Sequence, residues 1–418
     1  MGLLTVIFLA SLSAPSPAAP LDLSTALQLA QKVDERPAIA RSQAAEARAQ
    51  HRLAWSRLLP TLSLSGTYRR RAFEVVRAFE GQTATFQAFN ALATEGRVDT
   101  RLFDASAIPD IQATDLTAEA REAQAEDQAR QIAFQTAEAF YAALAADRTL
   151  AAAQQRLTLA TATSSDARAR FDAGLVARTE VDRTRLDEAE ARQSEAEAAR
   201  ARRLARVALG FLVGFEPTGR LMVPAPPAST LENRKYRRPD IEAARLLATA
   251  ARRAAWGPWL SMIPALDLAA SLRANNETGF QDQVFNWDIA LTLTWVLYDG
   301  GQRYAQADAR KAQTDAARLT LAALERTAEV ERARAAADLS ASMTVLEQAG
   351  MRARLAEELR TAVRERFNRG LASALEVTDA ATRAFEANVA LEQARFQTAQ
   401  AALALRNAVG AWPTADAS

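Results

Sequence analysis

The clearest pattern of apolar and polar positions lies in the second half of the chain. Between Phe285 and Tyr298, every other residue is apolar and most of the residues in between are polar. A period of two over such a length is typical of a β-strand with one apolar and one polar face. Residues 266–273 alternate in the same way. The sequence therefore predicts two neighbouring amphipathic strands.

The first half of the chain has a weaker version of the same pattern. Leu62, Leu64 and Tyr68 alternate with polar residues, whereas the segment from Val98 to Phe103 is short and charged. We expect two strands here, with a surface loop over about Glu74 to Gly96. Alternation over about 9 to 11 residues suits a transmembrane β-barrel, although strands of a soluble sandwich alternate equally. Four strands cannot close a barrel around a pore, so a barrel would need several chains.

Helical segments flank these strands and end at defined signals. Runs from Pro37 to Leu59 and from Pro239 to Ile263 are each followed by a proline, which stops a helix and favours extended backbone. Two much longer helices are expected over Asp110–Arg170 and Gly301–Arg366, each followed by a glycine-containing turn and a shorter return helix. At 1.5 Å per residue, about 60 residues extend on the order of 90 Å, so these helices must pack as hairpins or coiled coils.

The chain is an internal duplication with a period near 200 residues. Several short segments recur in the same order: Arg36-Pro-Ala-Ile39 and Arg238-Pro-Asp-Ile241, Pro60–Leu64 and Pro264–Leu268, Leu102-Phe-Asp104 and Leu297-Tyr-Asp299, and Arg170–Leu175 and Arg366–Leu371. We therefore expect a signal peptide over residues 1–20, a first repeat over 21–216, a linker over 217–236, a second repeat over 237–412 and a disordered tail over 413–418.

Composition narrows the class of protein. The formal net charge is +1, with both signs interspersed, which gives nucleic acid no basic surface. The sequence has no Cys and one His, and it shows no nucleophile elbow, metal-ligand spacing or phosphate-binding loop, so we expect no enzyme activity, cofactor or metal site. Residues 3–12 are apolar and precede small residues and prolines, as in a secretory signal.

The combined motifs resemble those of the TolC-like outer membrane efflux protein family, over about Leu21 to Trp412. They are the repeated Arg-Phe-x-x-Gly-Leu turn, the proline between helix and strand, and Leu-Tyr-Asp-Gly-Gly301 before the long helix. The resemblance implies a mainly α protein with a transmembrane β-barrel portion, made of two helix, strand, strand, long helix, helix repeats. It implies a homotrimer in the outer membrane that shares a 12-stranded barrel and a long α-helical barrel in the periplasm.

The resemblance also implies partners and site residues. A periplasmic adaptor protein would contact the helix tips, and an inner-membrane pump or ABC exporter would be reached through it. The tip residues are Arg170, Gly174, Leu175, Val176, Arg366, Gly370, Leu371 and Ser373. The periplasmic gate would use Thr179, Glu180, Glu376 and Asp379. The structural alternatives are a plain αα-turn for the glycines and ordinary helix-dipole partners for the acids.

This chain departs from the family pattern near the predicted gate. Where family members with a well-described gate have a Tyr and an Arg, this chain has Phe367 and Ala372. A barrel also predicts an aromatic belt against outer-membrane lipid, for which the candidates are Trp55, Trp256, Trp259 and Trp295.

The implied function is an exit duct of a tripartite efflux or type I secretion system. The alternative is an exported coiled-coil scaffold without a pore, and the cargo stays open.

Overall fold

The structure is a computed structural model that describes residues 19–79, 81–224, 237–278 and 283–414. Residues 1–18 of the expected signal peptide, 225–236 of the linker and 415–418 of the tail lie outside the described residues. The chain divides into two compact units. Unit 1 comprises residues 1–39, 126–239 and 326–418, and unit 2 comprises residues 40–125 and 240–325.

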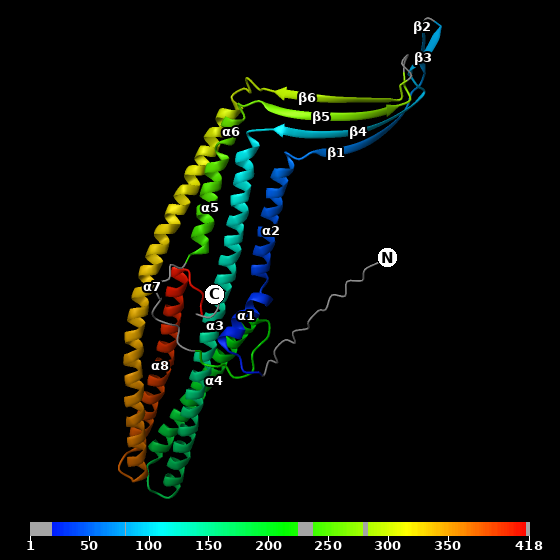
Figure 1. Ribbon diagram of the computed structural model, residues 1–418. Helices are drawn as coiled ribbons and strands as arrows, with labels where there is room; N and C mark the ends of the chain where they lie inside the picture. The colour runs from blue at the N-terminus through cyan, green and yellow to red at the C-terminus, as the bar shows by residue number, and fades with distance from the viewer. Residues whose placement is uncertain (1–18, 80, 225–236, 279–282, 415–418) are drawn as a thin grey trace. The chain divides into compact units, whose positions relative to one another are not determined.

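The elements repeat in the order that the duplication predicts (Figure 1). The first copy contains α2 (Glu35–Ser56), β1 (Thr61–Arg70), β2 (Val75–Phe79), β3 (Gln82–Gln87), β4 (Asn90–Phe103), α3 (Ala107–Asp172) and α4 (Arg178–Val213). The second contains α5 (Pro239–Ala254), α6 (Gly257–Leu260), β5 (Ala265–Asn275), β6 (Phe285–Thr294), α7 (Gln302–Asn368) and α8 (Ala374–Val409). Helix α1 (Leu23–Val33), which the patterns above do not predict, precedes them.

Four strands of unit 2 form one antiparallel sheet in the order β1-β4-β5-β6. Strands β1 and β4 come from the first copy and β5 and β6 from the second, so the two copies contribute equally to the sheet. Its outer strands are β1 and β6, whose free edges carry no strand of this chain within the described residues. The predicted strand pairs of both copies are confirmed.

The expected surface loop over Glu74 to Gly96 is wrong. Residues 75–87 form the separate two-stranded ribbon β2–β3, and β4 already begins at Asn90 and has 14 residues. The ribbon turns at Gly81, whose φ is 81°. Glycine adopts this left-handed conformation without strain because it has no Cβ. Strand β6 also ends earlier than expected, at Thr294.

The long helices were predicted correctly within a few residues, and one shorter helix was not. α3 has 66 residues and α7 has 67. The helix expected over Pro239–Ile263 is interrupted between α5 and α6, where Gly257-Pro258 follows the α5 C-terminus. Proline lacks the N–H that a continuous helix would need, so the helix restarts with Pro258 in its first turn.

The core of unit 1 forms where α1, α3 and α4 pack together. It contains Leu27, Phe140, Leu209 and Val213, all nearly inaccessible to solvent. Small buried alanines let the long helices approach closely, as at Ala153 of α3. Within the described residues, no helix contains an 18-residue window apolar enough to cross a membrane.

Candidate functional site

The four-stranded sheet of unit 2 has one apolar and one polar face. The strand register places alternate residues of all four strands on the same side. The exposed large apolar residues of one side are Leu62, Leu64, Tyr68, Leu92, Val98, Leu272, Phe285, Trp287, Ile289, Leu291 and Leu293. Leu62 is 81% exposed and Ile289 65% exposed. A continuous apolar surface of this kind is stable only against lipid or another apolar surface.

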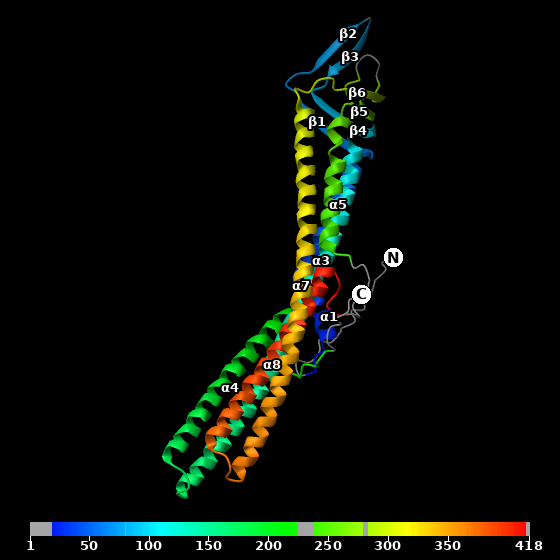
Figure 2. The ribbon, with the colours of Figure 1, turned by 90° about the vertical axis from the view of Figure 1, so that its left-hand side faces the viewer.

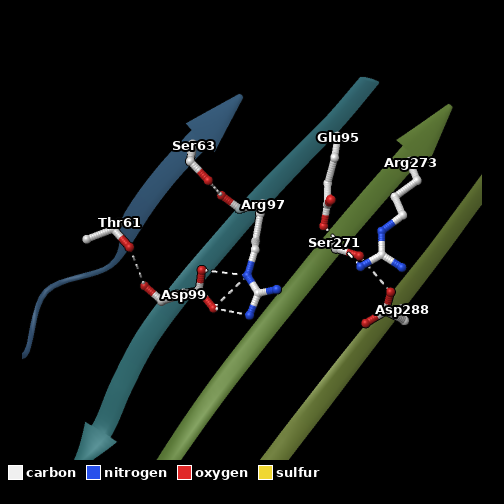
Figure 3. A network of polar contacts seen from close by, with 8 residues as sticks. All are labelled: Thr61, Ser63, Glu95, Arg97, Asp99, Ser271, Arg273 and Asp288. Atoms are coloured by element: carbon white, nitrogen blue, oxygen red, sulfur yellow. Dashed lines mark hydrogen bonds and ion pairs between the residues drawn. The ribbon is translucent and has the colours of Figure 1, made fainter. Parts of the chain in front are cut away.

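The opposite face carries a network of hydrogen bonds and ion pairs (Figure 3). The Arg97 Nε lies 2.7 Å from Oδ2 of Asp99 on the same strand, and Nη2 of Arg273 donates to Glu95 Oε1 across 3.1 Å. The Ser271 hydroxyl donates to Asp288 at 2.6 Å. Further along the same face, Arg101 of β4 pairs with Asp267 of β5. Because charges of both signs are paired on this face, within β4 and between β4 and β5, the face suits contact with water.

The four tryptophans that are candidates for an aromatic belt lie close to the end of the sheet where helices of unit 2 join the strands. Trp55 lies near the end of α2, Trp256 and Trp259 lie around α6, and Trp295 follows β6. All four are exposed, and the Trp295 indole N–H donates to the Met262 carbonyl at 3.0 Å. A ring with an apolar body and one bonded N–H is typical of a membrane interface.

The two predicted helix tips have the same backbone geometry. At the end of α3, Gly174 N–H donates to the Phe171 carbonyl and Leu175 N–H to the Arg170 carbonyl, both at 2.8 Å. At the end of α7, Gly370 and Leu371 make the equivalent bonds. The φ of Gly174 is 73° and that of Gly370 is 75°. These are Schellman-type ends, which glycine adopts without strain.

Side chains at the tips differ in their exposure. Leu175 is 74% exposed and Leu371 65% exposed, whereas Val176 is half-buried. Both turns lie at the same end of unit 1, as the two views agree (Figures 1 and 2). Each glycine turn therefore carries one exposed apolar leucine at this end of unit 1.

The predicted gate residues have local partners. Ser373 caps α8 and forms a capping box with Glu376. Asp379 pairs with Arg383 at 2.9 Å, one turn further along α8. Glu180 accepts a hydrogen bond from Ala374 N–H at 3.4 Å and so connects α4 to α8, whereas Thr179 is exposed. Glu376 and Glu180 thus accept hydrogen bonds at the start of α8, whereas Asp379 pairs within the helix.

Phe367 lies at the centre of a contact between the two hairpins, which we call the tip clasp: Arg170, Phe367, Arg364, Thr163 and Asp166. The Phe367 ring is only 2% exposed, and the Arg170 guanidinium of α3 lies 4.3 Å from its centroid. Arg364 lies 5.8 Å from the same ring and donates to Thr163 Oγ1 at 3.0 Å. It also lies 3.7 Å from Asp166. Two guanidinium groups, one from each hairpin, therefore lie near the Phe367 ring.

A second polar contact joins three helices of unit 1. Arg156 of α3 lies 3.2 Å from Asp187 of α4, and its guanidinium lies 5.2 Å from the ring centroid of Phe385 in α8. Burial raises the pKa of the Asp187 carboxyl, although the charge and hydrogen bond of Arg156 oppose this rise. The largely buried Arg156 side chain of α3 therefore contacts both α4 and α8.

Several residues of this arrangement were missed in the sequence. Arg364 and Thr163 are far apart along the chain, and no local motif connects them. At the sheet edge away from the helices, Tyr68, Phe285 and Trp287 are exposed on the apolar face. Their aromatic character and strand parity are visible in the sequence, so they could have been assigned to a second belt.

Exposed amphipathic strands joined to long helical hairpins define a class of outer-membrane channel proteins. The sequence model of the outer membrane efflux protein family matches residues 27–215 and again residues 231–411. The chain therefore belongs to the outer membrane efflux protein family, and the resemblance and the two-fold repeat are confirmed. Members of this family are channel proteins of the outer membrane with a periplasmic helical part. A scaffold without a pore is not supported.

Solved structures have the same fold at low sequence identity. The CmeC outer membrane channel of Campylobacter jejuni is 17% identical over 93% of this chain and 85% of that chain, with a TM-score of 0.77. The outer membrane protein VceC of Vibrio cholerae is 18% identical over 93% and 96%, with a TM-score of 0.77. The MtrE outer membrane channel of Neisseria gonorrhoeae, in its open state, is 19% identical over 95% and 90%, with a TM-score of 0.74. No curated protein matches the sequence.

Proposed function

We propose that this protein is the exit duct of a tripartite efflux or type I secretion system. In this proposal three chains form a homotrimer whose sheets close one 12-stranded barrel in the outer membrane. Substrate enters the helical part from an inner-membrane pump or ABC exporter by way of a periplasmic adaptor, and the chain itself performs no chemical step. The exposed apolar face of the four-stranded sheet is the observation that carries the proposal.

The free edges of the sheet support closure by neighbouring copies. An unpaired strand edge in lipid leaves backbone N–H and C=O groups without partners, at a cost of several kcal/mol per group. Since each neighbouring pair is antiparallel, β6 runs antiparallel to β1. The β6 edge of one chain can therefore pair with the β1 edge of the next by the same pattern as inside the sheet. Repeating this head-to-tail contact closes a ring.

The tips support the assignment of the adaptor contact and the gate. Exposed Leu175 and Leu371 beside the glycine turns would contact the adaptor. Glu180, Glu376 and Asp379 would lie near the narrow end of the duct, where three chains would repeat each carboxylate around the axis. Such rings attract cations and repel anions. The tip clasp would hold the two hairpins of one chain together while the duct is closed.

Cysteine cross-linking tests the shared barrel directly. Because the natural sequence has no Cys, Ser65→Cys on β1 and Ala290→Cys on β6 would introduce an unambiguous pair, with neighbouring β6 positions tested for register. Within one chain three strand spacings separate β1 from β6, about 14 Å, which exceeds the reach of a disulfide. Cross-linked dimers and trimers in membranes are therefore expected, together with stepwise conductance in planar bilayers.

The matched control keeps Ala290→Cys on the free edge but moves the other cysteine to the inner strand β4, as in Gly96→Cys. That pair should give no cross-linked oligomer. A monodisperse single chain in detergent-free buffer, without conductance and without cross-links from the edge pair, would contradict the proposed channel.

A further inference from the structure

Arg69 and Arg70 are the last residues of strand β1, at the end of the sheet away from the helices, and Arg71 follows them. Each of the three has a different environment. Arg69 shares the polar face with Ser63 and Ser65, because it has their parity along the strand. Arg71 makes an ion pair with Glu277, whose carboxylate also accepts from Ala88 N–H. Arg70 alone of the three ends the apolar face.

The Arg70 side chain is exposed and aromatic residues surround its end of the strand. Its guanidinium lies 4.9 Å from the centroid of the Phe89 ring. Tyr68, two residues earlier on the same face, donates its hydroxyl hydrogen to Asn90 Oδ1 at 2.9 Å. Among the described residues, no carboxylate forms an ion pair with Arg70. The ring face orients the guanidinium and leaves its N–H donors available.

The distance along the strand places this cation at the boundary of the apolar surface. Leu62 and Arg70 are eight residues apart on β1, about 27 Å at the rise of a β-strand. An apolar barrel surface is about 25 Å tall and ends in an aromatic girdle. Since the periplasmic helices join the sheet at the Leu62 end, Arg70 would lie at the level of the headgroups in the outer leaflet.

We infer that Arg70, oriented by Phe89, binds a phosphate group of the phosphorylated glycolipid in the outer leaflet. A guanidinium can donate two parallel N–H bonds to phosphate, which makes arginine well suited to this ligand. The three-arginine cluster would then be divided between functions, with Arg69 facing the duct and Arg71 fixing the connection to Glu277. This inference depends on the proposed function, because it requires the apolar face to lie in the membrane.

The test uses the full chain reconstituted in vesicles of phosphatidylcholine with or without lipid A, the phosphorylated anchor of that glycolipid. Binding of fluorescent lipid A is titrated for the natural protein and for Arg70→Gln, Arg70→Lys and Phe89→Leu. Arg70→Gln should weaken binding about tenfold, which corresponds to ~1.4 kcal/mol. Arg70→Lys and Phe89→Leu should each weaken it less. Arg69→Gln, on the opposite face, is the matched control and should change binding less than twofold.

Several outcomes would overturn the inference. Equal losses from Arg70→Gln and Arg69→Gln would mean that general charge, not this site, attracts the lipid. Displacement of lipid A by millimolar inorganic phosphate would identify a site for soluble anions instead. Unchanged binding by Arg70→Gln, with conductance retained, would refute the lipid site but leave the channel intact. Failure of the natural protein to insert into either vesicle would instead refute the proposed function.

Discussion

Replacing Phe367 by leucine should open the periplasmic end of the duct. The substitution keeps an apolar side chain of similar size at a position that is 2% exposed. It removes the ring that the guanidinium of Arg170 contacts at 4.3 Å and that of Arg364 at 5.8 Å. The contact between the α3/α4 and α7/α8 hairpins is therefore weakened without a new charge or a buried polar group.

The size of the effect follows from the two cation–π contacts. Each is worth roughly 0.5–1 kcal/mol for partly exposed cations, so Phe367→Leu loses roughly 1–2 kcal/mol per chain through these contacts. That energy corresponds to a change of about 5- to 30-fold in the ratio of open to closed hairpins. Arg364 keeps its bond to Thr163, so the hairpins should separate more often without losing all contact.

Open probability in planar bilayers is the direct measurement, and uptake of a large antibiotic by cells is the second. Val363→Ala is the matched control, because Val363 packs in the same core cluster as Phe367 but contributes no ring. Phe367→Tyr should behave like the natural protein because it keeps both contacts. If Val363→Ala raises the open probability as much as Phe367→Leu does, apolar packing and not the cation–π contacts keeps the tips closed.

Three further substitutions test other parts of the structure. Ile289→Arg on the apolar face should block insertion, at about 2–4 kcal/mol per chain, whereas Thr292→Arg on the polar face should insert normally in a membrane fractionation assay. Gly370→Ala should lower the denaturant midpoint through about 1 kcal/mol of backbone strain, because its φ is 75° and an added Cβ meets open space. Hydrogen bonds from Arg36 lower the pKa of the Asp34 carboxyl. Stability from Asp34 is therefore complete above its unfolded pKa of about 3.9 and is lost as pH falls through the lower folded value. In acid titrations followed by circular dichroism, Asp34→Asn should be less stable at neutral pH and show less further loss in this window.

The fold could be predicted where a residue pattern is sufficient to fix an element. The period of two in residues 285–294 predicts a strand with one apolar and one polar face. It also restricts the pairing, because a shift of one residue in register would turn the apolar side chains to the polar face. The long helices follow from uninterrupted helix-forming composition and a glycine turn. The ribbon β2–β3 was missed because its strands have only 5 and 6 residues, too few for a period to stand out. The signals in the sequence that favour a hairpin here are the β-branched Val75 and Val76 and the glycine at position 81.

The site was predictable only where its parts are close together in the sequence. The Arg-Phe-x-x-Gly-Leu motif located both tips because the hydrogen bonds of each turn join residues of the motif itself, from the Gly and Leu N–H groups to the Phe and Arg carbonyls. The tip clasp brings Arg170 against Phe367 from nearly 200 residues away, and the packing of four helices decides that contact. The sequence showed only that Phe367 stands where the resemblance implies a Tyr, whereas the structure shows two guanidinium groups near the Phe367 ring.

The two hairpins are not equivalent at their tips, although their turns are. The Ala177 side chain makes no capping bond at the start of α4, whereas Ser373 and Glu376 form a capping box at the start of α8. Glu180 of α4 accepts a hydrogen bond from Ala374 N–H in the first turn of α8. If the hairpins separated, α8 would lose the partner of its Ala374 N–H group, and α4 would lose no side-chain capping bond. The same movement would leave the Glu180 carboxylate without the Ala374 N–H donor.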